Sequence, residues 1–173
     1  MAEHYVDNQR FLEEISEYQK FRIDAKDKGE EPPPCPEYIG ECFLKIANRL
    51  SYRPNFINYA FREDMISDGI ENCVQYMNNF NPEKSKNPFS YFTQIIYYAF
   101  LRRIEKEKKQ NYIKFKLAEM NDDGSMGNWF KENYFEKDNL QVAMREHFNL
   151  SEEDIKRMTP KSKSKKGSTG PFE

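Results

Sequence analysis

Residues 64–109 read DMISDGIENCVQYMNNFNPEKSKNPFSYFTQIIYYAFLRRIEKEKK and contain two helical patterns separated by a turn. In the first pattern, residues 64–80, apolar side chains recur at alternating steps of four and three, the spacing of one helix face: Ile66, Ile70, Cys73, Met77 and Phe80. The opposite face is polar and carries Asp64, Ser67, Asp68, Glu71 and Gln75. Proline lacks the amide donor and disfavours helix at the residue before it, so Asn81-Pro82 and Asn87-Pro88 mark the turn.

The second pattern, residues 89–104, is apolar or aromatic on nearly every side of a helical wheel. Such a helix is either wholly buried or partly a stacking surface. It continues into a basic segment, because residues 102–116 contain seven Lys or Arg and two Glu in a chain whose net charge is −2. Cations neutralise phosphates while rings stack on unpaired bases, so this order favours a nucleic-acid interface. A solvated charged face is the common alternative reading of such a run.

The N-terminal part of the chain predicts two further helices. Residues 1–28 contain a helix that is capped by Asp7 or Asn8 and runs through Arg22, with its apolar face formed by Phe11, Ile15 and Tyr18, and we expect it to dock on the main domain. Residues 24–36 are charged and proline-rich, and we interpret 29–36 as a linker rather than a polyproline ligand. Helical periodicity returns over residues 37–50. The sequence therefore predicts an all-α fold whose main helical domain spans residues 37–116.

Beyond residue 116 the charge changes sign. Residues 117–154 contain ten acidic and three basic side chains, and we expect residues 117–160 to form an acidic extension with two short helices. One falls within residues 129–147, and the other is capped by Ser151 with Asp154 at its third position. Residues 161–173, KSKSKKGSTGPFE, are of low complexity and are expected to form a disordered basic tail.

The motifs of several functional classes are missing. The seven glycines form neither a phosphate-binding loop nor a dinucleotide turn, and the two histidines have no metal-ligand spacing, so no enzyme chemistry, cofactor or metal site is indicated. Asp122-Asp123 lies in a Gly/Ser loop, where solvated carboxylates are commoner than a cation site. Three cysteines without paired spacing favour reduced cytosolic thiols, and no apolar run is long enough for membrane insertion.

The residues resemble a known family. Asp64-Met65-Ile66-x-Asp68-Gly69, followed by a turn and an aromatic helix that begins Phe89-Ser90-Tyr91-Phe92 and ends on Arg103, resembles conserved region 2 of bacterial sigma factors. Five further segments resemble the late-transcription sigma factors of T-even-type bacteriophages: Tyr5-Val6-Asp7-Asn8, Asn55-Phe56, residues 64–71, Lys86-Asn87-Pro88 and residues 103–109. The resemblance covers about residues 5–116 and implies a compact helical sigma region 2 domain.

The resemblance also implies partners and sites. The polar face of residues 64–80 (Asp64, Ser67, Asp68, Glu71 and Gln75) would bind the β′ clamp helices of the host core RNA polymerase, where composition alone favours a solvated helix face. The helix after the turn would read and help to melt an AT-rich −10 promoter element, by holding unpaired bases. Two adjacent faces remain open as the DNA-facing side, and with the basic run they include Tyr91, Phe92, Ile95, Ile96, Tyr98, Ala99, Arg102, Arg103, Lys106 and Lys109. The expected location is the cytoplasm of the infected bacterial host.

The chain departs from the sigma pattern at two places. Bacterial primary sigma factors carry adjacent tryptophans where this chain has Ile95-Ile96, so an aliphatic wedge would act there. No helix-turn-helix domain for the −35 element follows residue 116. In the phage family a coactivator and the DNA sliding clamp assist promoter opening, and only Phe172-Glu173 resembles the clamp-binding epitope. The alternative functions are a polymerase-binding regulator, such as an anti-sigma factor or coactivator, that does not read DNA, and a domain whose aromatic helix is merely core.

Overall fold

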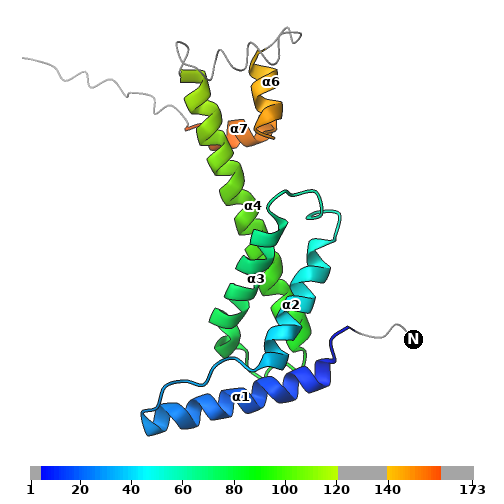
Figure 1. Cartoon of the computed structure of the whole chain (residues 1–173), viewed down its shortest axis with the longest axis vertical. Helices are drawn as coiled ribbons and strands as arrows, with labels where there is room; N and C mark the ends of the chain where they lie inside the picture. Colours follow the sequence, from blue (N-terminus) through cyan, green and yellow to red (C-terminus); the bar gives the residue numbers. More distant parts are fainter. Residues whose placement is uncertain (1–4, 121–139, 161–173) are drawn as a thin grey trace, which may run out of the picture. The chain divides into compact units, whose positions relative to one another are not determined.

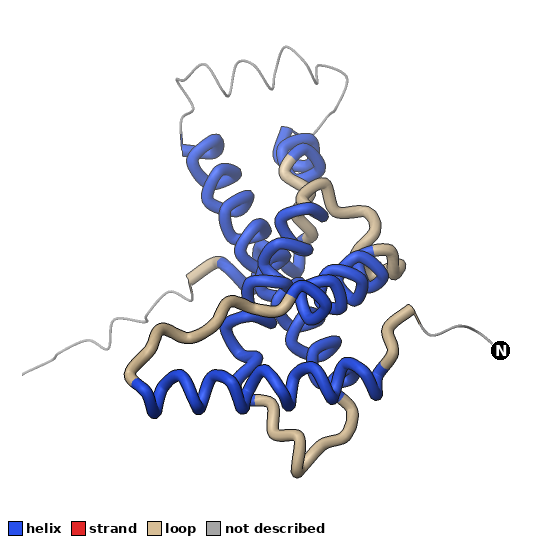
Figure 2. Tube along the Cα trace, turned by 60° about the horizontal axis from the view of Figure 1, so that its bottom comes forward, coloured by secondary structure: helices blue, strands red, loops and turns tan. Residues whose placement is uncertain are grey.

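The computed structural model describes residues 5–120 and 140–160, and every regular element in these two ranges is a helix (Figures 1 and 2). The predicted all-α fold class is confirmed. The chain divides into two units, Met1–Ile104 and Glu105–Glu173, so that the boundary falls within helix α4 (Pro88–Met120). We had expected the main domain to span residues 37–116, with the N-terminal helix docked on it. The first unit includes that helix and ends at Ile104, before the basic run is complete.

Helix α1 (Asn8–Lys28) begins where the sequence predicts. The Asp7 carboxylate caps it by accepting hydrogen bonds from the backbone N–H groups of Gln9 and Arg10 at 3.0 and 3.1 Å. The helix ends at Gly29, whose φ of 72° lies in the left-handed region that glycine adopts without strain. Residues 24–28 are thus helical, and only residues 29–36 form the linker, because the charged residues before Gly29 continue a helix without penalty.

Helices α2 (Glu37–Ser51) and α3 (Arg62–Tyr76) follow, and a short 3₁₀ turn η1 (Met77–Asn79) extends α3. α1 packs against α2, and α2 packs against α3 (Figure 1). The turn to α4 is built by two asparagines. Asn81 Oδ1 accepts a hydrogen bond from the Glu83 N–H at 2.8 Å, and Asn87 Oδ1 accepts one from the Ser90 N–H at 3.0 Å, in the first turn of α4.

The Asn8 side chain joins the starts of α1 and α4. Its Oδ1 accepts a hydrogen bond from the Phe89 N–H at 3.1 Å, and its Nδ2 donates to the Lys86 carbonyl at 3.2 Å. Asn8 therefore satisfies an N–H group that α4 itself leaves without a helical partner. These contacts fix the first turn of α4 against the start of α1.

The core of the first unit is aromatic. Phe11, Ile15 and Tyr18 of α1 are buried in it, as their spacing predicts. Phe43 and Phe92 lie at its centre with ring centroids 4.7 Å apart, within the range of favourable tilted ring contacts. Side chains from all four helices and the loop before α3 meet there; its five fully buried phenylalanines are Phe11, Phe43, Phe56, Phe92 and Phe100.

The second unit has a small core of its own. It contains residues 105–120 of α4, helix α6 (Leu140–His147) and helix α7 (Glu152–Met158). The buried residues are Phe115, Ala118, Met144 and Leu150. The predicted cap of α7 is confirmed: Ser151 and Asp154 form a capping box, and α6 coincides with the end of the helix expected in residues 129–147. Residues 129–139 and the expected disordered tail 161–173 lie outside the described residues.

Candidate functional site

The polar face of α3 lies on the surface, as its pattern predicts. Asp64, Ser67, Glu71 and Gln75 are exposed, and Asp68 is half-buried. The opposite side enters the core, where Ile66, Cys73, Met77 and Phe80 are buried and Ile70 is partly buried. The stripe has two further buried members, Met65 and Gly69, which the spacing argument omitted. The structure therefore gathers all five predicted polymerase-binding side chains on one accessible face.

Gly69 sets how closely α3 approaches α4. A Cβ atom at this position would lie 3.0 Å from Ile96 Cγ2 and 3.1 Å from Phe100 Cε1, which is tighter than nine in ten real Cβ contacts. Only glycine lets the two helices pack at this separation without displacing those side chains. The two adjacent residues therefore differ in role: Asp68 places its carboxylate at the surface of α3, and Gly69 allows the close contact between α3 and α4.

We had expected Arg103 to lie on an open DNA-facing surface, but it does not. Its side chain is 17% exposed and crosses from α4 to α3, where Nη2 lies 2.9 Å from Asp64 Oδ2 and Nη1 lies 3.3 Å from Asp68 Oδ2. A guanidinium at this depth needs carboxylate partners, and α3 supplies two on successive turns. Arg103 therefore belongs to the α3 surface and partly neutralises it.

Arg102 is exposed but also engages α3. Its Nη2 donates a hydrogen bond to Asn72 Oδ1 at 2.7 Å, and Asn72 Nδ2 donates to the Asp68 carbonyl at 2.7 Å. Asn72 was missed by sequence reasoning. The available signal was its position four residues after Asp68, which places both on the same side of α3.

The two faces of α4 that the sequence left open are now distinguished. Phe92, Ile96 and Ala99 are 0%, 0% and 2% exposed, so these three predicted DNA contacts are wrong: they pack in the core and present no surface to a base. The adjacent face is at least partly accessible. Tyr91 and Ile95 are half-buried, and Tyr98 is 50% exposed.

The two tyrosine rings on the accessible face of α4 differ in how much of their surface is packed against other residues. Tyr91 packs against Phe80 with ring centroids 5.2 Å apart, and burial raises the pKa of its hydroxyl. Tyr98 has an edge contact with Tyr97 at 5.8 Å and leaves half of its surface open. Tyr98 is therefore the better candidate for stacking on an external planar group.

A groove of about 340 Å³ runs beside Tyr98 in the first unit. Its lining includes Thr93, Gln94 and Tyr97 of α4, Leu50 in the last turn of α2 and Arg53 in the loop that follows α2. Sequence reasoning did not find Arg53 or Gln94 as site residues, because α2 and α4 are brought together only by the fold. The groove offers flat rings, an amide and a cation around one space, a set of groups that suits a planar polar ligand.

The basic run continues in the second unit. Lys106 and Lys109 are exposed, as their assignment to DNA requires. Lys108 is turned inward, where its Nζ donates to Asp154 Oδ2 at 2.9 Å and Oδ1 at 3.1 Å. The predicted clamp-binding residues Phe172 and Glu173 lie outside the described residues.

Comparison with known proteins adds no family assignment. The chain matches no protein-family model, and a search of curated proteins finds no match. Within residues 5–120 and 140–160, no cluster of three or more His, Cys, Asp or Glu side chains is arranged to hold a metal ion. Over the same residues, no helix combines the length and apolar character needed to cross a membrane.

Proposed function

We propose that this protein is a sigma factor of the phage late-transcription type, which binds a host core RNA polymerase and directs it to AT-rich −10 elements. One observation supports the proposal above the others. α3 and α4 pack closely at Gly69 and leave two chemically different surfaces in one unit, an acidic face on α3 and the Tyr98 groove on α4. A helical domain with a purely structural α4 needs neither surface.

In this proposal the acidic face of α3 docks on the polymerase. Glu71 is the best residue to test, because it is exposed and stands apart from the ion pairs of Arg103 with Asp64 and Asp68. Glu71→Lys is expected to leave folding intact and weaken binding to core polymerase by about tenfold or more, equivalent to ~1.4 kcal/mol. The matched control is Glu17→Lys, the same charge change on an exposed position of α1.

Biolayer interferometry with immobilised core polymerase measures both affinities. Circular dichroism checks that both variants keep the helical content of the parent protein. Equal affinity of the parent and the Glu71→Lys protein would remove α3 as the polymerase-binding face.

The accessible face of α4 would hold the unpaired strand of the promoter. Base–aromatic stacking is worth about 1–3 kcal/mol per base, so Tyr98→Ala should reduce open-complex formation by a corresponding factor. Tyr76→Ala is the control, because Tyr76 is also exposed, at 42%, but lies on α3. Potassium permanganate footprinting of unpaired thymines on a duplex promoter with a TATAAATA-like box reports the opening directly.

A template with a mismatched −10 region separates melting from binding. If Tyr98 acts by stabilising separated strands, the defect of Tyr98→Ala should largely disappear on this template. Normal opening of the duplex promoter by Tyr98→Ala would mean that Tyr98 takes no part in promoter melting.

One observation favours a polymerase-binding regulator that does not read DNA. Arg102 and Arg103, two of the cations expected to contact phosphates, are both engaged with α3. Run-off transcription by core polymerase and this protein decides between the two functions. A regulator binds polymerase but yields neither transcripts nor permanganate-reactive thymines.

A further inference from the structure

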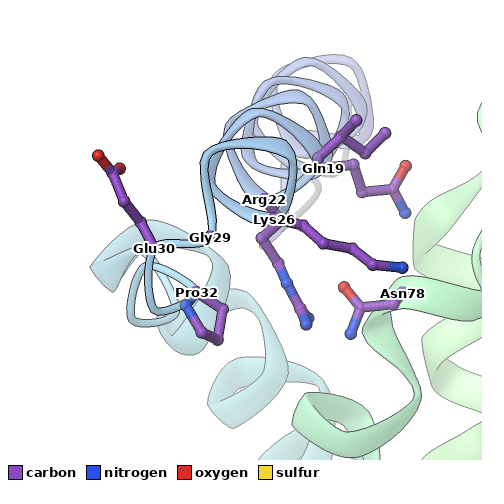
Figure 3. A pocket seen from close by; sticks show the side chains of 8 residues that line it. Gln19, Arg22, Lys26, Gly29, Glu30, Pro32 and Asn78 are labelled. Atoms are coloured by element: carbon purple, nitrogen blue, oxygen red, sulfur yellow. The ribbon is translucent and has the colours of Figure 1, made fainter.

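A cavity of about 560 Å³ opens between the C-terminal half of α1, the linker and η1 (Figure 3). It lies within the first unit and on different elements from the α3 face and the Tyr98 groove. Its polar lining comes from Gln19, Arg22, Lys26, Glu30 and Asn78, and Ile23 and Pro32 add apolar surface. A volume of this size accommodates a few residues of a peptide or a small organic ligand.

Hydrogen bonds hold the walls of this cavity in place. Gln19 Nε2 donates to the carbonyls of Met77 and Phe80 at 3.3 and 2.8 Å, which ties α1 to η1. The Tyr18 hydroxyl donates to the Pro33 carbonyl at 2.9 Å, which ties the linker to α1. Because these hydrogen bonds are made within the chain itself, they hold the walls without help from a ligand, which would not have to order them on binding.

The charge of the cavity is unbalanced. Arg22 and Lys26 are one helical turn apart and extend from α1 toward Asn78, whereas Glu30 points away from them (Figure 3). Neither cation takes part in an ion pair with another described residue. The helix dipole accounts for cations only in the last turn of α1, which holds Lys26 and Lys28, and Arg22 lies before that turn. Two such cations facing one space attract an anionic ligand.

The remaining lining indicates which anion fits. No aromatic ring lines the cavity, so it offers no stacking surface to a nucleic-acid base. Ile23 is instead 60% exposed beside Pro32, and this apolar surface suits an aliphatic side chain next to a carboxylate. We propose that this cavity binds a short acidic peptide segment of a partner protein, with its carboxylates on Arg22 and Lys26 and an aliphatic residue against Ile23 and Pro32.

Fluorescence anisotropy with the full-length protein tests the proposal. The probe is a fluorescein-labelled peptide Gly-Ser-Glu-Leu-Glu-Leu-Gly-Ser, and its Gln-for-Glu counterpart tests the need for carboxylates. We expect the Glu peptide to bind more tightly, and Arg22→Gln/Lys26→Gln to weaken it by about tenfold or more, since hydrogen bonds to charged groups are among the stronger ones. The matched control Lys20→Gln/Lys28→Gln removes the same charge from exposed α1 positions outside the cavity lining and should change the affinity less than about twofold, the part expected from net charge alone.

Several results would overturn the proposal. Equal loss in both double variants would mean that the peptide senses only the net charge of α1. Tighter binding of octathymidylate than of the peptide, lost in Arg22→Gln/Lys26→Gln, would make this a phosphate site. In ¹H–¹⁵N NMR spectra, the side-chain amide signals of Gln19 and Asn78 should shift with the peptide, and unchanged signals at millimolar peptide would exclude the cavity. None of these outcomes bears on polymerase or promoter binding, so this proposal and the proposed function fail separately.

Discussion

Substituting Gly69 by alanine places a methyl group in the contact between α3 and α4. The new Cβ atom would lie 3.0 Å from Ile96 Cγ2 and 3.1 Å from Phe100 Cε1. Both neighbours are fully buried, so a shift of either side chain would disturb the core around it. The helices must therefore separate by a few tenths of an ångström or the side chains must leave their preferred rotamers.

Two effects of opposite sign decide the stability change. Alanine in a helix interior is favoured over glycine by about 1 kcal/mol, whereas overpacking a core typically costs about 1–3 kcal/mol. Gly69→Ala should therefore destabilise the first unit by between zero and about 2 kcal/mol. Gly40 in α2 provides the control, because a Cβ there meets nothing within 4 Å. Gly40→Ala should show the helical gain alone, a stabilisation of about 1 kcal/mol.

Urea unfolding followed by circular dichroism measures the free energy of unfolding of both variants. Hydrogen exchange of peptides from α2 and α3 locates the change in stability. For a unit of this size, 1 kcal/mol corresponds to a shift in Tm of about 4–8 °C. We expect the two variants to shift in different directions, or at least to differ by more than about 1 kcal/mol. Equal stabilisation by Gly69→Ala and Gly40→Ala would refute the inference that Gly69 allows the close approach of α3 and α4.

Three further outcomes are expected. Burial opposes ionisation of Asp154, but hydrogen bonds from Lys108 and Ser151 outweigh this effect and lower the pKa of Asp154 below its ordinary value of 3.8. The stability that the ionised carboxylate adds is therefore present above pH 3.8 and is lost as the pH falls through the lowered pKa. Thermal melts should therefore show Asp154→Asn less stable than the parent at pH 7 by about 1 kcal/mol or more, with the difference fading on acidification below 3.8. Burial raises the pKa of both the Cys35 and the Cys73 thiols, but Cys35 is only half-buried whereas Cys73 is fully buried, so Ellman's reagent should label Cys35 in the native protein and Cys73 only after unfolding. A double-mutant cycle of Arg103→Gln with Asp68→Asn, by urea unfolding, should give a coupling of about 0.5 kcal/mol or more, and additive effects would show that their ion pair contributes nothing.

Amphipathic patterns predicted the parts of the fold in which one side of a helix is polar. The start of α1, the extent of α2 and the exposed face of α3 follow from the residues of each helix alone. The end of α1 at Lys28 was less clear, because a charged stretch before prolines reads equally as helix or linker until Gly29 is seen to adopt a positive φ.

The orientation of α4 was beyond the reach of its own sequence. Residues 89–104 are apolar on nearly every side, so periodicity does not say which side is buried. The choice is made by distant residues: Phe43 of α2 receives Phe92, and Gly69 of α3 receives Ile96. The same limit hid the groove, since Arg53 and Gln94 meet only after α2 and α4 have packed.

The basic run of α4 contains cations that are bound within the protein and cations that are exposed to solvent. Arg102 and Arg103 read as one basic segment with Lys106 and Lys109, yet Arg102 binds Asn72 and Arg103 binds the carboxylates of Asp64 and Asp68. A guanidinium held by carboxylates must break those contacts before it can neutralise a phosphate. In the proposed promoter complex, the first unit therefore contributes mainly rings and the groove, while the exposed lysines of α4 contribute charge. Because only phosphate contacts release counterions, substitutions at Lys106 and Lys109 should lower the salt dependence of DNA binding, and Tyr98→Ala should lower affinity at every salt concentration alike.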